Sequence, residues 1–179
     1  MRVYILVAVK RARYFLPALF LFLPARTAEA RLFVFPDFPW GENTTEVEIA
    51  AGGKGWRLAE KTLDPDRREL IYRTVFLEKE CRISFLFTPV GDKLFSVRAE
   101  WEGSGFGYVL AEKFKKRYRT PREEMPLLKT YIWSRQYTEV ELRHDGDSTR
   151  LIFSNLNLWT EYREEMKRIK EMQKEQEGE

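Results

Sequence analysis

The only histidine in the chain, His144, is followed closely by two aspartates, Asp145 and Asp147. An imidazole beside carboxylates could bind a metal ion or act as a general acid and base. A zinc site needs three or four ligands, however, and a calcium loop needs more oxygens than Asp145, Asp147 and Ser148 supply. The run His-Asp-Gly-Asp is also typical of a tight turn between two strands. We therefore expect an exposed turn here, with no metal, no cofactor and no catalytic residue.

The densest group of positive charges lies at residues 113–122 and includes Lys115, Lys116 and Arg117. Cations are favoured near the C-terminus of a helix, because the helix dipole is negative there. The same charges could instead bind a polyanion or anionic lipids. Both interpretations place the cluster at the end of a helix.

Five tryptophans are spread along the chain. Large amphipathic side chains fill a core or, where several are exposed on one face of a sheet, mark a binding surface. The candidate binding surface that we take from the sequence consists of Trp40, Trp56, Trp101, Lys115, Lys116 and Arg117.

Residues 1–30 have the order of a secretory signal peptide. A basic cluster at residues 10–13 precedes an apolar run at residues 15–23, and the small residues Ala28 and Ala30 form an A-x-A cleavage motif. The apolar run is about half of the ~20 residues that a membrane span requires. We expect cleavage after Ala30, no stable membrane span in the product, and a periplasmic or secreted location. An uncleaved membrane anchor is the alternative.

The charge distribution fits this division. The chain has 31 basic and 28 acidic side chains, of which residues 1–30 hold five and one, so the remaining net charge is −1. The positive charge of the whole chain is therefore no argument for nucleic-acid binding, and we expect none. The single cysteine, Cys81, cannot form an internal disulfide, and its alternation with apolar residues indicates a core position.

Periodicity predicts one α+β domain over residues 31–170. Alternating apolar residues predict strands at 56–58, 69–77, 81–87, 94–101, 130–134, 138–143 and 149–153. Helical spacing and capping residues predict helices at 43–51 (with Asn43 or Thr44 as a cap), at 104–117 (with Ser104 as a cap), and from about 155. We expect an antiparallel sheet with helices packed on one face. Helix-then-strands occurs twice, at 43–101 and 104–154, which indicates a weak αβββ duplication.

The C-terminal helix carries an apolar stripe, formed by Trp159, Tyr162, Met166 and Ile169, that should pack on the domain. If the Trp159 ring is buried, its replacement by alanine should destabilise the protein by about 3 kcal/mol. No large apolar residue follows Met172. We therefore expect residues 171–179 to form a solvated charged tail that frays from about Gln173.

Several short segments resemble those of small exported bacterial envelope proteins. They are an aromatic-Pro-Trp-Gly lead-in (Phe38-Pro39-Trp40-Gly41), a helix ending in Lys-Lys-Arg-Tyr (115–118), and a closing Leu-Trp-x-Glu-Tyr segment (158–162). The helix-plus-meander order is similar to that of the outer-membrane assembly accessory lipoproteins and the β-lactamase-inhibitor-like fold. The resemblance implies an α+β fold in the cell envelope. Unlike the accessory lipoproteins, this chain has no cysteine for lipid attachment near Ala30.

The sequence also has no Gly-rich phosphate loop after a strand and no Gly-x-Ser-x-Gly motif. We therefore expect a non-enzymatic, exported binding or assembly module of the bacterial cell envelope, with another envelope protein as its partner. The alternative is a periplasmic enzyme or small-ligand-binding protein that uses a pocket on the sheet face.

Overall fold

The computed structural model describes residues 35–103, 105–145 and 147–177. The predicted signal peptide, with Ala28 and Ala30, lies outside the described residues. The helical elements are α2 (Thr44–Gly53), α3 (Phe106–Tyr118), the 3-10 turn η2 (Pro126–Leu128) and α4 (Leu156–Glu177). The strands are β1 (Arg57–Asp64), β2 (Arg67–Phe76), β3 (Lys79–Phe87), β4 (Leu94–Glu102), β5 (Glu123–Met125), β6 (Thr130–Arg135), β7 (Thr138–His144) and β8 (Ser148–Asn155).

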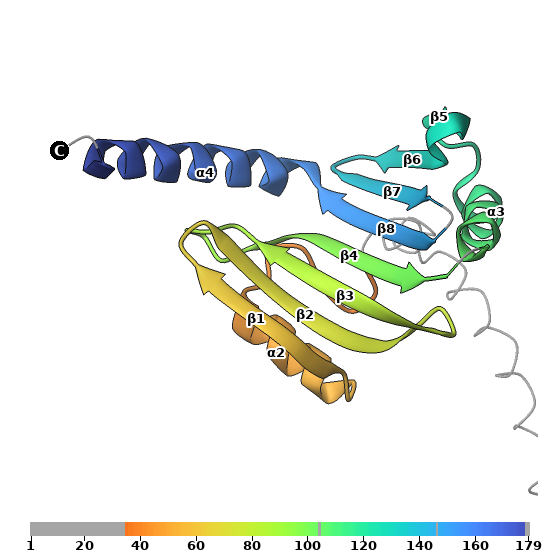
Figure 1. Ribbon diagram of the computed structural model, residues 1–179, viewed down its shortest axis with the longest axis horizontal. Coiled ribbons are helices and arrows are strands. Elements are labelled where there is room, and N and C mark those ends of the chain that lie inside the picture. The colour runs from red at the N-terminus through yellow and green to blue at the C-terminus, as the bar shows by residue number, and fades with distance from the viewer. Residues whose placement is uncertain (1–34, 104, 146, 178–179) are drawn as a thin grey trace, which may run out of the picture. The chain divides into compact units, whose positions relative to one another are not determined.

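These strands form one antiparallel sheet in the order β1-β2-β3-β4-β8-β7-β6-β5 (Figure 1). A helix followed by four strands occurs twice, as α2 with β1–β4 and as α3 with β5–β8, and the two units meet where β4 pairs with β8. The α+β prediction is confirmed. The prediction of three strands per repeat was wrong for both units. In the first unit β1 is a full strand of the sheet, and in the second β5 lies in a segment that we expected to be a loop.

One face of the sheet carries an aromatic and aliphatic core. Phe85 pairs with Val97 across β3 and β4, and Val97 pairs with Phe153 on β8, so the three side chains lie on the same face. All three are buried. The segment before α2 adds Phe35 and Phe38, whose ring centroids lie 6.1 and 4.6 Å from that of Phe85.

Two helices pack on this face. Val47 and Ala51 of α2 are buried. Just after this helix, the Trp56 ring lies 6.2 Å from the rings of both Tyr72 and Phe85. From α3, Phe106 contacts Trp101 and Phe114 contacts Trp133, at ring distances of 5.2 and 5.6 Å. The expectation of helices on one face therefore holds for α2 and α3.

The helix starts differ in how they are capped. Of the two expected caps, Asn43 is the one that caps α2. Its side chain accepts from the Glu46 N–H, and the Glu46 carboxylate accepts from the Asn43 N–H, a reciprocal capping box. α3 begins after Gly105, which makes no side-chain cap, and Ser104 lies outside the described residues.

α4 follows β8 directly and contacts β4 and β8. The Phe95 ring on β4 lies 4.6 Å from Tyr162 and 5.4 Å from Trp159. Trp159 is still 40% exposed, so the apolar stripe is only partly covered there. The helix runs through Glu177, beyond the expected fraying point at Gln173, and the side chains of residues 171–176 are exposed.

Candidate functional site

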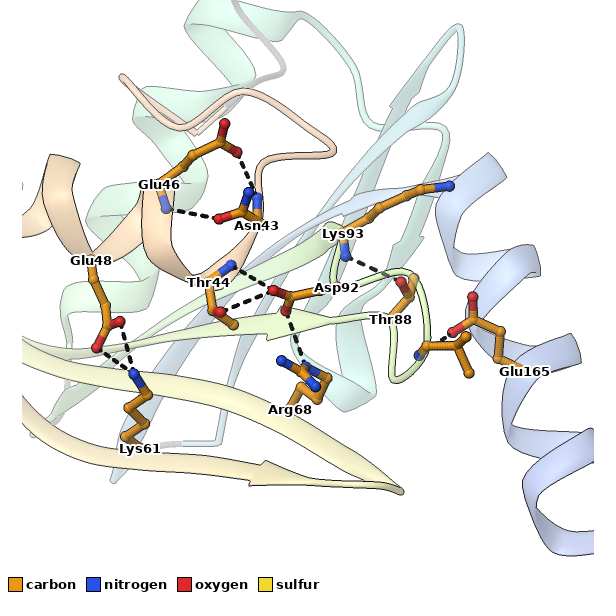
Figure 2. A network of polar contacts seen from close by, with 11 residues as sticks. Asn43, Thr44, Glu46, Glu48, Lys61, Arg68, Thr88, Asp92, Lys93 and Glu165 are labelled. Atoms are coloured by element: carbon orange, nitrogen blue, oxygen red, sulfur yellow. Dashed lines mark hydrogen bonds and ion pairs between the residues drawn. The ribbon is translucent and has the colours of Figure 1, made fainter.

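A network of polar contacts surrounds Asp92, in the turn between β3 and β4 (Figure 2). One carboxylate oxygen of Asp92 accepts from the backbone N–H and the hydroxyl of Thr44, at 3.3 and 3.0 Å. The other accepts from Nε of Arg68 on β2, at 3.1 Å. Asp92 therefore joins the start of α2 to the strands.

The same turn holds α4. The backbone N–H of Val90 donates to Glu165 at 2.8 Å, and the Lys93 ammonium donates to Glu161 at 2.6 Å (Figure 2 shows the first contact). These two glutamates lie one helical turn apart. Because the chain's own donors engage both glutamates and Asp92, this cluster connects α2, the turn and α4, and we assign it a structural role.

The three candidate tryptophans contribute to packing. Trp101 is 1% exposed, and its indole N–H donates to the Phe76 carbonyl at 3.3 Å. Trp56 is half-buried and contacts the rings of Phe38, Tyr72 and Phe85. Trp40 is half-buried, and its indole nitrogen is inaccessible to solvent. Trp101 is thus a core residue, and the three do not form an exposed aromatic patch.

His144 is not in an exposed turn, as we expected, but is the last residue of β7 and is 4% exposed. Its ring is stacked on Tyr131 at 6.1 Å and meets Tyr108 of α3 edge-on at 4.3 Å. Nε2 is buried without a hydrogen-bond partner. The turn itself follows one residue later, where Asp145 accepts from the N–H and hydroxyl of Ser148.

The surroundings of His144 favour its neutral form. Burial lowers the pKa of its imidazole most, the nearby Lys129 lowers it further, and Asp145 opposes this by raising it. The unfolded chain therefore binds the proton more readily than the folded chain does. The contribution to stability is complete above about pH 6.5 and is lost as the pH falls through the lower folded pKa.

We expect His144→Phe, which keeps an aromatic ring and removes the titration, to lose less stability between pH 7 and pH 5 than the wild type. The difference between the two curves should not exceed about 1.4 kcal/mol per pH unit, the limit for one proton. Urea denaturation at several pH values measures it. Parallel curves for the two proteins would show that His144 does not titrate differently on folding.

The predicted basic residues lie in the last turn of α3. The Lys115 ammonium pairs with Glu124 on β5 at 3.0 Å and lies 4.8 Å from the Tyr131 ring centroid. The Arg117 guanidinium lies over the Tyr118 ring, and the Lys116 side chain is exposed. The structure therefore separates these cations from the candidate tryptophans, and Lys115 is partly neutralised.

The exposed apolar turn η2 lies in a segment that we expected to be a loop. Leu127 is 98% exposed and Leu128 is 68% exposed. Lys129 follows directly, and its ammonium lies 5.8 Å from the ring centroid of Tyr108 on α3. This contact joins η2 to α3, and Figure 1 shows the two at the same end of the strands. The sequence held a signal for this exposure. Leu127 and Leu128 follow Pro126 in a predicted loop, where no helical or strand periodicity places them on a buried face.

We call this region the α3–η2 surface. It consists of the side chains of Tyr108, Val109, Lys113, Lys116, Leu127, Leu128 and Lys129, all of which are exposed except the half-buried Lys129.

Positive charge is concentrated in this part of the chain. Residues 106–129 hold seven basic and three acidic side chains, a net charge of +4. The other residues from 31 onward hold 19 basic and 24 acidic side chains, a net charge of −5. Residues 106–129 are therefore a basic segment in a remainder that is acidic, although the net charge of residues 31–179 is close to zero.

Other features give weaker candidates. Within residues 35–103, 105–145 and 147–177, no group of three metal-ligating side chains comes together, and no helix is long and apolar enough to cross a membrane. Burial raises the pKa of the Cys81 thiol to about 11, so its reactive thiolate is disfavoured. A hollow of 540 Å³ lies along α4 and is lined by Tyr162, Arg163, Met166, Lys167, Lys170, Glu171 and Lys174.

Comparisons of the chain with protein-family models, curated proteins and solved structures gave no match.

Proposed function

We propose that this chain is a non-enzymatic, exported binding module of the bacterial cell envelope, and that it binds an anionic envelope component through the α3–η2 surface. The order of residues 1–30 supports export, to the periplasm or outside the cell. The observation that carries the binding site is the exposure of Leu127 and Leu128 within the basic segment 106–129.

The chemistry of the surface fits binding better than catalysis. Its side chains are amines, two leucines, a valine and a tyrosine, with the imidazole of His144 buried beneath Tyr108. Amines attract an anionic partner over long range, and apolar side chains gain free energy when contact removes them from water. The envelope provides anionic components in abundance, so the proposed location and the proposed site agree.

We expect the triple variant Lys113→Glu, Lys116→Glu, Lys129→Glu to bind washed bacterial envelopes about tenfold or more weakly than the wild type. Co-sedimentation at low salt measures the bound fraction. Raised salt should weaken wild-type binding in the same direction, because exposed charges are screened.

The matched control is Lys167→Glu, Lys170→Glu, Lys174→Glu on α4, which makes the same change in net charge at exposed positions. We expect this control to bind nearly as well as the wild type. If both triple variants lose binding equally, net charge and not the α3–η2 surface determines it, and the proposed site is wrong. If neither loses binding, the cations have no part in it.

A further inference from the structure

We propose that the α3–η2 surface binds an anionic phospholipid bilayer, with Leu127 and Leu128 inserted among the lipids and the lysines on the headgroups. This inference rests on the proposed function and names the partner of the same site. It makes the chain a peripheral membrane protein whose membrane contact is a short turn.

The backbone of η2 is suited to a weakly polar environment. Pro126 at the start of the turn has no N–H, the Lys129 N–H donates to the Pro126 carbonyl at 3.1 Å, and the Thr130 hydroxyl donates to the Leu128 carbonyl at 3.0 Å. Polar backbone groups are costly in lipid unless they are satisfied internally. Much of the turn's hydrogen bonding is thus provided by the chain itself, while both leucine side chains remain exposed.

The charges around η2 leave the lysines available for headgroups. The two acidic residues of β5 are engaged, Glu123 by Arg122 at 2.7 Å and Glu124 by Lys115 at 3.0 Å. Among the described residues, no ion pair is found for Lys113, Lys116 or Lys129. The Lys113 and Lys116 side chains on α3 are exposed, and the half-buried Lys129, next to the leucine pair, has its ammonium over the Tyr108 ring. Juxtamembrane lysines are attracted to anionic lipid surfaces.

Tyr108 is placed where an interfacial aromatic residue would be useful. It is exposed, and the Lys129 ammonium lies over its ring. Tyrosine is favoured at the level of lipid headgroups because its ring is apolar and its hydroxyl is polar. The residues that dominate protein–protein binding are typically aromatic or arginine side chains packed in pockets at the centre of the interface. Here the exposed apolar residues are two leucines in a turn of a basic segment. We therefore favour the bilayer over a protein.

The first test is binding to vesicles that contain equal parts of phosphatidylglycerol and phosphatidylcholine. The wild type and all variants are expressed from the full sequence in a bacterial host that exports them, so that they share one N-terminus. We expect the double variant Leu127→Asn, Leu128→Asn to bind about tenfold or more weakly than the wild type. Transfer of a leucine side chain from water to an apolar environment stabilises the bound state by an amount that corresponds to about a tenfold or larger change in affinity. Val90→Asn, at a residue that is 74% exposed on another turn, is the control and should bind like the wild type.

The second test reads insertion directly. Leu127→Cys carries an environment-sensitive fluorophore; the native Cys81 is buried and its thiol has a pKa of about 11, so it should not be labelled. We expect a blue shift of the emission with the anionic vesicles and a smaller one with phosphatidylcholine alone, while a label at Val90→Cys stays unshifted. No shift at position 127 in bound protein would overturn insertion. If the wild type binds envelopes through its lysines but does not bind these vesicles, the proposed function stands and the bilayer is the wrong partner.

Discussion

Replacing Gly107 with alanine is expected to destabilise the protein by about 3 kcal/mol, the upper range for overpacking a filled interior. Gly107 lies in the first turn of α3, where the helix meets the end of β7. A Cβ on this residue would lie 2.3 Å from Cβ and 2.5 Å from Cγ of His144. These atoms cannot move away as the end of a flexible side chain could, so α3 must shift from the sheet.

The sign of this effect makes it diagnostic, because alanine normally stabilises a helix interior over glycine by about 0.5–1 kcal/mol. Gly52→Ala in α2 is the matched control: nothing lies within 4 Å of its added Cβ, and we expect the ordinary gain. Urea denaturation of both variants measures the two effects. If Gly107→Ala is as stable as the wild type, α3 does not approach His144 as closely as described.

Trp101→Ala is expected to destabilise the protein by about 4 kcal/mol, as for other large buried aromatic residues. The ring is 1% exposed and stacks on Phe76 at 6.0 Å, and Phe106 of α3 packs against it. The substitution also leaves the Phe76 carbonyl without the indole donor. Since domains of this size have a total stability of about 5–15 kcal/mol, much of the protein should unfold under mild denaturant.

The comparison is Trp159→Ala on α4. Because that ring is 40% exposed, we expect a loss of about 1 kcal/mol instead of the 3 kcal/mol that a buried ring would give. Midpoints of urea denaturation with unchanged slopes would separate the two variants cleanly. Equal losses at positions 101 and 159 would contradict the difference in burial.

The fold was predictable where a local pattern has one structural meaning. The alternation of Phe95, Val97, Ala99 and Trp101 identified β4. The capping residues Asn43 and Thr44 placed the start of α2 to within one residue. β5 was missed because three residues, Glu-Glu-Met, are too short to show alternation, and the strand exists only through its pairing with β6. Pairing between distant segments has no local signature.

The site was harder to predict because exposure depends on tertiary contacts. Turn chemistry correctly predicted a turn between β7 and β8 but wrongly placed His144 in it. The burial of that ring depends on Gly107 and Tyr108 of α3, which no local pattern connects to it. The tryptophans were ambiguous for the same reason, since core and surface tryptophans look alike in a sequence. The charge of residues 106–129 could be counted from the sequence, whereas the contact between Lys129 and Tyr108 that joins η2 to α3 could not.

Amide hydrogen exchange with and without washed envelope vesicles tests binding at the α3–η2 surface most directly. Residues 119–129 include exposed loop and turn amides, which should exchange quickly in the free protein. We predict that vesicles slow exchange in this segment and in the neighbouring turns of α3, and leave β1 and α4 unchanged. Protection that appears on α4 or along β1, with residues 119–129 unaffected, would contradict the account.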